Sequence, residues 1–353
     1  MVARFRSFLP IVAFALAGCG SDSTGADAAP ASDQDAAVAA QPDAGAERQP
    51  DAAAPRTDDG GDDGGGGESI QERCFPGLGD PDQPGPNYDQ FEPIVGSHCG
   101  GTDHQEITGI ERVVFLGDSI TEGSPPTLSW QFYRTLLADS LAERFGDDLE
   151  VSNCSAWGAR TDDLLLPPHE QILGCFAEAE PRRTLVVMTI GGNDMSAIAQ
   201  DALDGVPPEE SLAQVDEALQ LLRDAVDWLF ADPARFPNGV FVVFANVYEF
   251  TDGEGDLTAC PGAALAGFTE PWPDGRDAFI RMDEGMMRIA VETGTDLIFL
   301  LESFCGHGFH AGDPDNQCYR GPDAETWFDF TCIHPNPTGH AEIARLFMDV
   351  VDE

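Results

Sequence analysis

The sequence predicts an α/β fold, a three-layer sandwich in which helices cover both faces of a mostly parallel five-stranded sheet. Two observations support this prediction. From about residue 111 onward, short apolar runs alternate with longer segments whose apolar residues recur at helical spacing. Several of the short runs end at a glycine or a polar residue. Such alternation is typical of buried parallel strands joined by helical crossovers.

The elements can be placed in chain order from these patterns. Unbroken apolar runs of strand length predict the strands, and amphipathic stretches of more than ten residues predict the helices. The expected strands are 113–116, 149–151, 185–190, 240–247 and 297–301. The expected helices are 128–145, 212–229, 277–291 and 338–351.

Residues 1–18 have the features of a bacterial export signal. Arg4 and Arg6 precede an apolar run at 8–17 that is too short to span a bilayer as a mature helix. The order Leu-Ala-Gly-Cys that ends at Cys19 resembles a lipobox, so we expect lipidation of Cys19. The exported protein would then lie in the cell envelope, on the periplasmic face or the cell surface. A plain signal peptide and a secreted product are the alternative.

Composition divides the rest of the chain into three parts. Residues 19–68 are mostly Ala, Asp, Gly and Pro, which favours a disordered acidic tether. Residues 69–110 form an irregular, cysteine-containing lead-in, and 111–353 form the folded domain. The net charge of -45 argues against nucleic acid as a partner and against attraction to anionic lipid, so a membrane would be reached only through the lipid on Cys19.

The chain has nine cysteines, and setting Cys19 aside leaves an even number. In an exported protein this favours four disulfides, whose connectivity the sequence does not determine. Zinc is disfavoured because no Cys-x-x-Cys pair occurs. Pairing of near neighbours is expected for Cys74 with Cys99, Cys154 with Cys175, and Cys318 with Cys332.

Four polar motifs follow strands or precede the last helix. A serine hydroxyl needs a neighbouring base to become nucleophilic, and histidine serves near neutral pH. Preorganised N–H donors then stabilise the oxyanion that forms. The motifs are Gly117-Asp118-Ser119, residues 153–161 around Gly158, residues 191–194 around Asn193, and residues 334–340 starting at His334.

In their order, these motifs resemble the four blocks of the SGNH (GDSL) hydrolases, a family of serine esterases and lipases with a flavodoxin-like fold. The resemblance covers about residues 110–350. It implies that Ser119 is the nucleophile and His334 the base. It also implies an oxyanion hole formed by the N–H groups of Ser119 and Gly158 and the side-chain amide of Asn193. It implies neither a metal nor another cofactor.

One position departs from the family pattern. The family places an aspartate three residues before the histidine, where this chain has Thr331. The nearest acid is Asp329. Either Asp329 orients the His334 ring as the third catalytic residue, or a backbone carbonyl does so.

Other polar and aromatic residues have less specific expectations. Asp118 would brace the nucleophile turn, Asp194 would hold the Asn193 loop, and His340 would be structural. Trp157 would line the substrate mouth or pack as a core aromatic, and Asp162 and Asp163 would start a helix. His307, His310, Asp313 and Asp315 could bind a metal, although a solvated loop is favoured.

The resulting expectation is a monomeric ester hydrolase acting on small-acyl, lipid or O-acetylated carbohydrate esters. No long apolar lid segment is evident, which mildly favours small acyl groups or decorated glycans. One alternative is a catalytically silent surface-binding module on the same fold. Another is a glycan-binding protein that uses Trp130, Trp272 and Trp327 as exposed contacts.

Overall fold

In the computed structural model, which describes residues 69–75, 78 and 84–353, five strands form one sheet in the order β2-β1-β3-β4-β5. Every neighbouring pair of strands is parallel, which confirms the predicted α/β architecture. All residues of β1 and β3 are buried, as expected for the centre of a covered sheet. The strands are β1 (Arg112–Gly117), β2 (Glu150–Asn153), β3 (Thr184–Thr189), β4 (Val240–Ala245) and β5 (Asp296–Ile298).

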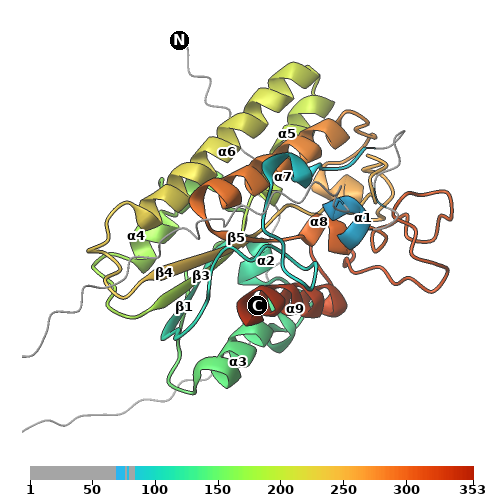
Figure 1. Cartoon of the computed structure of the whole chain (residues 1–353). Coiled ribbons are helices and arrows are strands. Elements are labelled where there is room, and N and C mark those ends of the chain that lie inside the picture. The colour runs from blue at the N-terminus through green and yellow to red at the C-terminus, as the bar shows by residue number, and fades with distance from the viewer. Residues whose placement is uncertain (1–68, 76–77, 79–83) are drawn as a thin grey trace, which may run out of the picture. The chain divides into compact units, whose positions relative to one another are not determined.

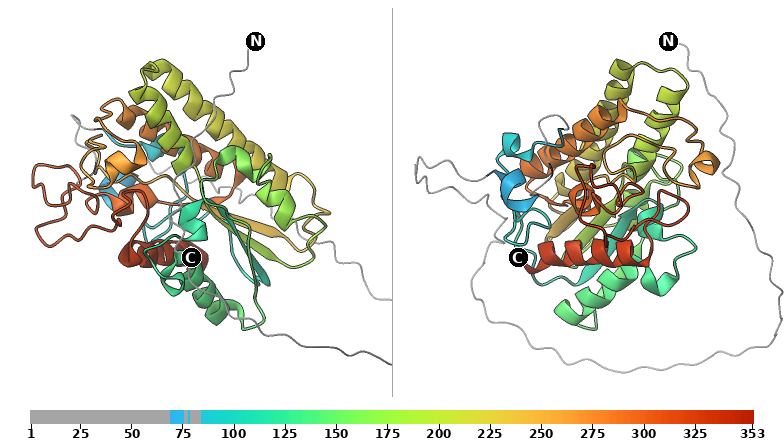
Figure 2. Two further views of the ribbon diagram at one scale, coloured as in Figure 1. Left: turned by 180° about the vertical axis from the view of Figure 1, so that it is seen from behind. Right: turned by 90° about the vertical axis from the view of Figure 1, so that its right-hand side faces the viewer.

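Long helices cover the two faces of this sheet (Figures 1 and 2). On one face lie α5 (Gly192–Leu203), α6 (Pro208–Phe230) and α7 (Gly275–Thr293), which pack on one another. On the other face lie α3 (Tyr133–Phe145) and α9 (Pro337–Asp352), which form a pair. None of the described helices is both long enough and apolar enough to cross a membrane.

The remaining helical turns are short and sit mainly in connections. They are α1 (Ile70–Cys74), α2 (Ser119–Glu122), α4 (Gln171–Cys175) and α8 (Leu300–Phe304), with 3-10 turns η1 (Tyr88–Phe91), η2 (Ser129–Gln131), η3 (Thr161–Leu164) and η4 (Ala263–Ala266).

The structure differs from the expected elements at several places. The helix expected at 128–145 begins only at Tyr133, after the turn η2, and the strand expected at 240–247 ends at Ala245. The fifth strand ends at Ile298, because Asn246 Oδ1 accepts the N–H groups of Leu300 at 2.6 Å and Leu301 at 2.9 Å and turns the chain into α8. An apolar run alone cannot distinguish these two outcomes. Asp162 and Asp163 lie in the 3-10 turn η3 and do not start an α-helix. Helix α5 was not predicted, since its first turn coincides with the Gly-Gly-Asn-Asp motif.

The described part of the lead-in packs against the open edge of the sheet at β5. Gly101 forms an antiparallel bridge with Ile298, and Thr102 Oγ1 donates to Asp296 Oδ1 at 2.8 Å. The disulfide between Cys74 and Cys99 closes this segment on itself. The backbone groups of the edge strand are therefore partly covered. The signal and tether expected at 1–18 and 19–68 lie outside the described residues, as does Cys19.

Four disulfides join the eight described cysteines. Two expected pairs, Cys74–Cys99 and Cys154–Cys175, are confirmed. The expected pairing of Cys318 with Cys332 is wrong, because folding brings each of them beside a different cysteine. The observed pairs are Cys260–Cys332, separated by 72 residues, and Cys305–Cys318, separated by 13.

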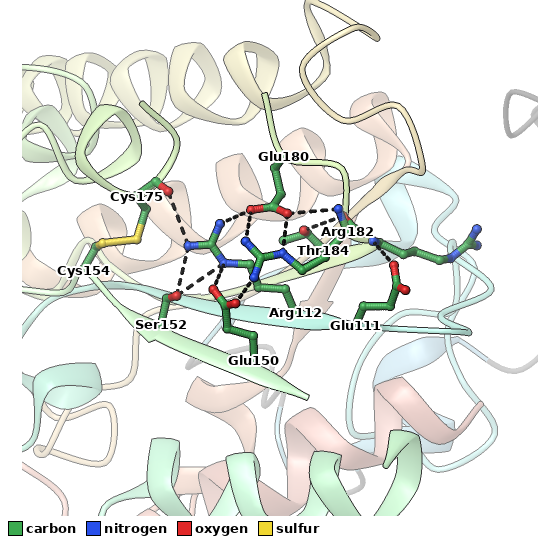
Figure 3. A network of polar contacts seen from close by, with 10 residues as sticks. Glu111, Arg112, Glu150, Ser152, Cys154, Cys175, Glu180, Arg182 and Thr184 are labelled. Atoms are coloured by element: carbon green, nitrogen blue, oxygen red, sulfur yellow. Dashed lines mark hydrogen bonds and ion pairs between the residues drawn. A yellow bond between two sulfur atoms is a disulfide. The ribbon is translucent and has the colours of Figure 1, made fainter. Parts of the chain in front are cut away.

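A partly buried ionic network joins the first strands at their amino ends (Figure 3). Arg112 of β1 pairs with Glu180 and donates to Ser152 Oγ of β2 at 2.9 Å. Arg182 reaches Glu180 at 2.6 Å and also pairs with Glu150. Because the side chains of Arg112 and Glu180 are only 10% and 5% exposed, loss of Arg112 would leave the buried Glu180 carboxylate with Arg182 as its remaining cationic partner.

The substitution Arg112→Leu should lower the free energy of unfolding by about 3 kcal/mol, because it removes one partner of a buried ion pair. Urea denaturation followed by circular dichroism measures this. Arg345→Leu is the matched control: the Arg345 side chain is 51% exposed, and loss of its surface pairs should cost about 0.5 kcal/mol. Equal effects of the two substitutions would contradict a structural role for the buried network.

Candidate functional site

The predicted nucleophile lies at the carboxyl end of the central strand β1. Gly117 ends this strand with φ 120, and a Cβ there would lie 1.9 Å from the carbonyl oxygen of Thr189, so only glycine allows β1 and β3 to approach this closely. Ser119 then begins α2, whose N-cap is Asp118. The turn leaves the Ser119 side chain partly exposed at the sheet edge.

Asp118 braces this turn. Its Oδ1 accepts the N–H of Ile120 at 3.0 Å and the hydroxyl of Thr189 at 3.0 Å. Burial raises the pKa of Asp118 to about 7, while these hydrogen bonds act in the opposite direction. The buried carboxyl group therefore holds the turn around Ser119 to β3 by accepting these two hydrogen bonds.

The predicted base meets the predicted nucleophile. His334 Nε2 lies 2.8 Å from Ser119 Oγ, across 215 residues of sequence. The ring is placed by the start of α9, where Asn336 caps the helix through the N–H of Gly339 at 3.0 Å. Burial lowers the pKa of His334 and the negative charge of Asp329 raises it, with burial the larger effect. The imidazole is therefore mainly neutral at neutral pH and can accept a proton.

A hydroxyl group, and not a carboxylate, contacts the other ring nitrogen. Thr331 Oγ1 lies 2.9 Å from His334 Nδ1 and donates to Asp329 Oδ1. A carboxylate only accepts hydrogen bonds, and a threonine hydroxyl has a single proton to donate. Thr331 must therefore accept from Nδ1–H. The neutral ring then has no proton on Nε2, the nitrogen that faces Ser119.

This arrangement differs from both expected ways of orienting the histidine. Among the residues that the structure describes, the Asp329 carboxylate accepts hydrogen bonds from Thr331 alone, and the partner of His334 Nδ1 is the Thr331 hydroxyl and not a backbone carbonyl. The reason is a tight turn in which Asp329 N–H donates to the His334 carbonyl at 2.9 Å, so their backbones face each other. Cys332 takes φ 76 inside this turn and is joined to Cys260. Sequence reasoning missed Thr331, although a hydroxyl residue at the family's aspartate position was the available signal.

The predicted oxyanion donors lie on two neighbouring loops. Asn193 is the second residue of α5, and its side-chain Nδ2 donates to the Ala159 carbonyl at 2.9 Å. This bond uses one of the two amide protons and leaves the other available. Gly158, the residue before Ala159, has φ 76 and is exposed. Within the described part of the chain, no hydrogen bond occupies the N–H of Ser119 or of Gly158.

Asp194 holds the Gly158 loop against α5. It accepts the N–H of Thr161 at 3.1 Å and the Thr161 hydroxyl at 2.9 Å. Burial raises the pKa of Asp194 to about 6, and the two Thr161 hydrogen bonds act against this rise. The carboxyl group thus links the second and third motifs, a wider role than the expected one of holding the Asn193 loop.

Other residues singled out in the sequence have roles away from the reacting atoms. His340 Nδ1 accepts the N–H of Tyr133 at 3.1 Å, and burial lowers its pKa to about 3, which fits the expected structural role. Trp157 is 58% exposed and donates to the Gly123 carbonyl at 2.9 Å, so it is not a core aromatic.

Two further expectations concern a metal site at 307–315 and three tryptophans that could contact a glycan. The described residues contain no group of three or more His, Cys, Asp or Glu side chains that could hold a metal. His307 instead stacks on Trp327 with ring centroids 3.5 Å apart. The expectation that Trp130, Trp272 and Trp327 are all exposed is wrong, because Trp272 is only 6% exposed.

A cavity of about 170 Å³ opens beside the Ser119–His334 pair. Its wall is mostly apolar and comes from α5, from the long connection between β4 and α7, from the first half of α7, from α8 and from the lead-in. The reacting side chains are thus accessible to a ligand and next to an apolar space.

Comparison with known proteins places this geometry in context. The profile of the GDSL-like lipase/acylhydrolase family matches residues 115–342, which include all four motifs. A search of curated proteins finds no match.

Several solved structures are similar at low identity. An extracellular lipase from Streptomyces rimosus is 20% identical, with a TM-score of 0.45, and covers 68% of this chain and 99% of its own. An acetyl xylan esterase is 18% identical, with a TM-score of 0.45, and covers 68% and 99%. An esterase from Pseudoalteromonas sp. is 16% identical, with a TM-score of 0.39, and covers 69% and 97%. Identities this low do not transfer the substrates of those enzymes to this chain.

The substitution Asp329→Asn should lower the pKa of His334 further, because it removes the negative charge that raises this pKa against the effect of burial. Titration of the imidazole by NMR measures the change. Asp315→Asn, at an exposed position, is the control and should leave the titration unchanged. An unaltered His334 pKa in Asp329→Asn would refute the electrostatic link between the two side chains.

Proposed function

The chain belongs to the GDSL-like lipase/acylhydrolase family, and on this premise we propose that it hydrolyses carboxylic esters through an acyl-enzyme intermediate on Ser119. The observation that carries the proposal is the 2.8 Å contact between Ser119 Oγ and His334 Nε2. Among the described residues, the N–H groups of Ser119 and Gly158 have no hydrogen-bond acceptor, so both are available as donors. A binding module would not require this pairing of a hydroxyl with an unprotonated imidazole nitrogen.

In the first half of the proposed reaction, Ser119 Oγ attacks the ester carbonyl while His334 Nε2 takes the hydroxyl proton. The carbonyl oxygen becomes an oxyanion that accepts hydrogen bonds from Ser119 N–H, Gly158 N–H and Asn193 Nδ2. When the C–O bond to the alcohol breaks, His334 returns its proton to the leaving oxygen. The acyl group remains on Ser119.

In the second half, His334 takes a proton from water, and the resulting hydroxide attacks the acyl-enzyme carbonyl. The ester bond to Ser119 breaks, the serine oxygen recovers the proton from His334, and the carboxylic acid leaves. Thr331 and Asp329 act as positioning residues in both halves. They keep the proton of the neutral ring on Nδ1. When His334 is protonated, its Nδ1–H still donates to the Thr331 hydroxyl, which in turn donates to the Asp329 carboxylate.

We also propose that the enzyme works outside the cytoplasm, anchored by lipid on Cys19. Support comes from the signal-like segment at 1–18 and from the four disulfides of the described residues. Disulfides persist mainly in oxidising compartments. Mass spectrometry of the membrane fraction for a diacylated N-terminal cysteine tests the anchor.

The substitution Ser119→Ala should abolish hydrolysis of a chromogenic p-nitrophenyl ester, because the other hydroxyl of α2, that of Thr121, is fully buried and bonded to Tyr133 and Thr189. A fluorophosphonate probe should label the wild-type chain at Ser119 and leave the variant unlabelled. Circular dichroism checks that the variant is folded. Wild-type protein that is folded but neither labelled nor active would support the silent binding module instead.

Activity should be lost as the pH falls through the pKa of His334, which lies below its usual range, because only the neutral ring accepts the serine proton. Thr331→Val should reduce kcat/KM by about a hundredfold, since the Nδ1 proton loses its acceptor and the tautomer is no longer fixed. It should also move the acid limb to lower pH, because the imidazolium loses a hydrogen bond that stabilises it.

Thr331→Ser keeps the hydroxyl and is the matched control, which should recover most of the activity and the wild-type acid limb. A purely structural role for Thr331 predicts lower activity with an unmoved pH profile. That result in the valine variant would rule out the proposed positioning role.

A further inference from the structure

The N–H of Gly158, one of the proposed oxyanion donors, lies in an exposed loop with little packing around it. A Cβ at this position would meet no heavy atom within 4 Å in the described part of the chain. A donor of this kind acts only while it stays aimed at the place where the oxyanion forms. Contacts of neighbouring residues must therefore hold the Gly158 N–H in place.

This donor lies at the tip of a β-turn. Ala159 N–H donates to the Ala156 carbonyl at 3.2 Å. Trp157 and Gly158 are therefore the two central residues of the turn. The base of the turn is fixed, because Ala156 N–H donates to the Gly117 carbonyl at 2.9 Å and Ala159 is buried. The peptide group that carries the donor joins the two central residues and lies beyond both of these contacts.

The side chain of Trp157 anchors the tip of the turn. Its Nε1–H donates to the carbonyl of Gly123 at 2.9 Å. Gly123 is the C-cap of α2, and its own N–H donates to the Ser119 carbonyl at 2.8 Å. Two hydrogen bonds in series thus connect the peptide group that carries the Gly158 donor to the helical turn that carries the nucleophile.

A second contact joins the same loop to the end of α2. Glu122, the residue before Gly123, accepts a hydrogen bond from Asn153 Nδ2. The same carboxylate oxygen lies 3.1 Å from the hydroxyl of Ser155. The start of the loop and its tip are therefore attached to two consecutive residues of one short helical turn.

Trp157 contributes little to the core. The residue is 58% exposed, so the ring is not needed to fill the interior. Substitutions at exposed positions usually change the free energy of unfolding only slightly. A large loss of activity on substitution of Trp157 would therefore report on the site and not on the stability of the domain.

We propose that Trp157 is a positioning residue for the oxyanion hole, with Glu122 as its support. The bond from Trp157 sets the separation between the two backbone donors, the N–H groups of Ser119 and Gly158. The inference rests on the proposed ester hydrolysis, and it adds two residues that act on the reaction through others. Because the oxyanion exists only after attack on the carbonyl, their effect falls on the transition state and not on the bound ester.

The variant Trp157→Phe keeps an aromatic ring and removes the indole N–H. We expect kcat/KM on p-nitrophenyl acetate to fall about tenfold, near the upper end of what one hydrogen bond contributes. The same factor should apply to the butanoyl and hexanoyl esters. Trp130→Phe is the matched control, because Trp130 is 64% exposed and belongs to η2, outside the turn; its kcat/KM should be unchanged.

A trifluoromethyl ketone reports on the oxyanion directly. Ser119 Oγ adds to its carbonyl carbon, the hydroxyl proton passes to His334, and the carbonyl oxygen becomes an oxyanion on an adduct that has no leaving group. The inhibition constant should therefore rise about tenfold in Trp157→Phe, in step with the loss of kcat/KM. The pKa of His334, measured by NMR titration, should not move, because the contact between the ring and the serine stays intact.

The second contact is tested by Glu122→Ala, which should lower kcat/KM about threefold. In the double variant with Trp157→Phe, the loss should exceed the product of the single losses, because each contact compensates in part for the other. It should not exceed about a thousandfold, the effect of removing one oxyanion donor. If circular dichroism shows that Trp157→Phe is unfolded, Glu122→Ala alone provides the same three measurements with the smaller factor.

Several results would overturn the proposal. Unchanged kcat/KM in Trp157→Phe, or an equal loss in Trp130→Phe, would remove the role of the indole N–H. A loss that grows with the length of the ester would assign Trp157 to substrate contact, and an altered His334 pKa would place the damage at the Ser119–His334 pair. Failure of the proposed function is distinguishable, because the wild-type protein itself would then neither hydrolyse esters nor react with a fluorophosphonate.

Discussion

The hydrogen bond between Ser119 and His334 depends on two chain segments that meet only at the carboxyl edge of a parallel sheet. In a parallel sheet all strand ends of one kind lie along one edge, so loops distant in sequence become neighbours. Here β1 delivers the serine, β3 and α5 deliver Asn193, and the turn before α9 delivers His334. The buried centre of the sheet fixes these positions, because β1 and β3 cannot shift without disturbing the whole core.

Much of this arrangement was predictable from the sequence. The apolar runs located the five strands, and the polar motifs after them located Ser119, Gly158 and Asn193 at one edge. These predictions rely on local patterns whose physical cause is also local: burial of a strand and the sharp turn that glycine permits. The family profile matches the same region, residues 115–342.

The remaining features depend on contacts that no local pattern encodes. Whether Asp329 contacts His334 directly depends on the conformation of the turn between them. In this turn the Thr331 hydroxyl lies between the Asp329 carboxylate and His334 Nδ1. The partner of Cys332 is decided by where the β4–α7 connection folds, not by distance along the chain. The cavity also belongs to this class, since it forms between α5, which was not predicted, and a long irregular connection.

Whether the disulfide between Cys260 and Cys332 forms depends on the redox state of the compartment that holds the protein. In a reducing cytosol both residues stay as thiols, and the turn that carries the imidazole is held to the rest of the domain by noncovalent contacts alone. In the oxidising compartment where we propose that the enzyme works, the disulfide fastens that turn. Under the proposed export, the chain carries all of its reacting groups before this disulfide forms, and the oxidising compartment supplies the reaction that forms it.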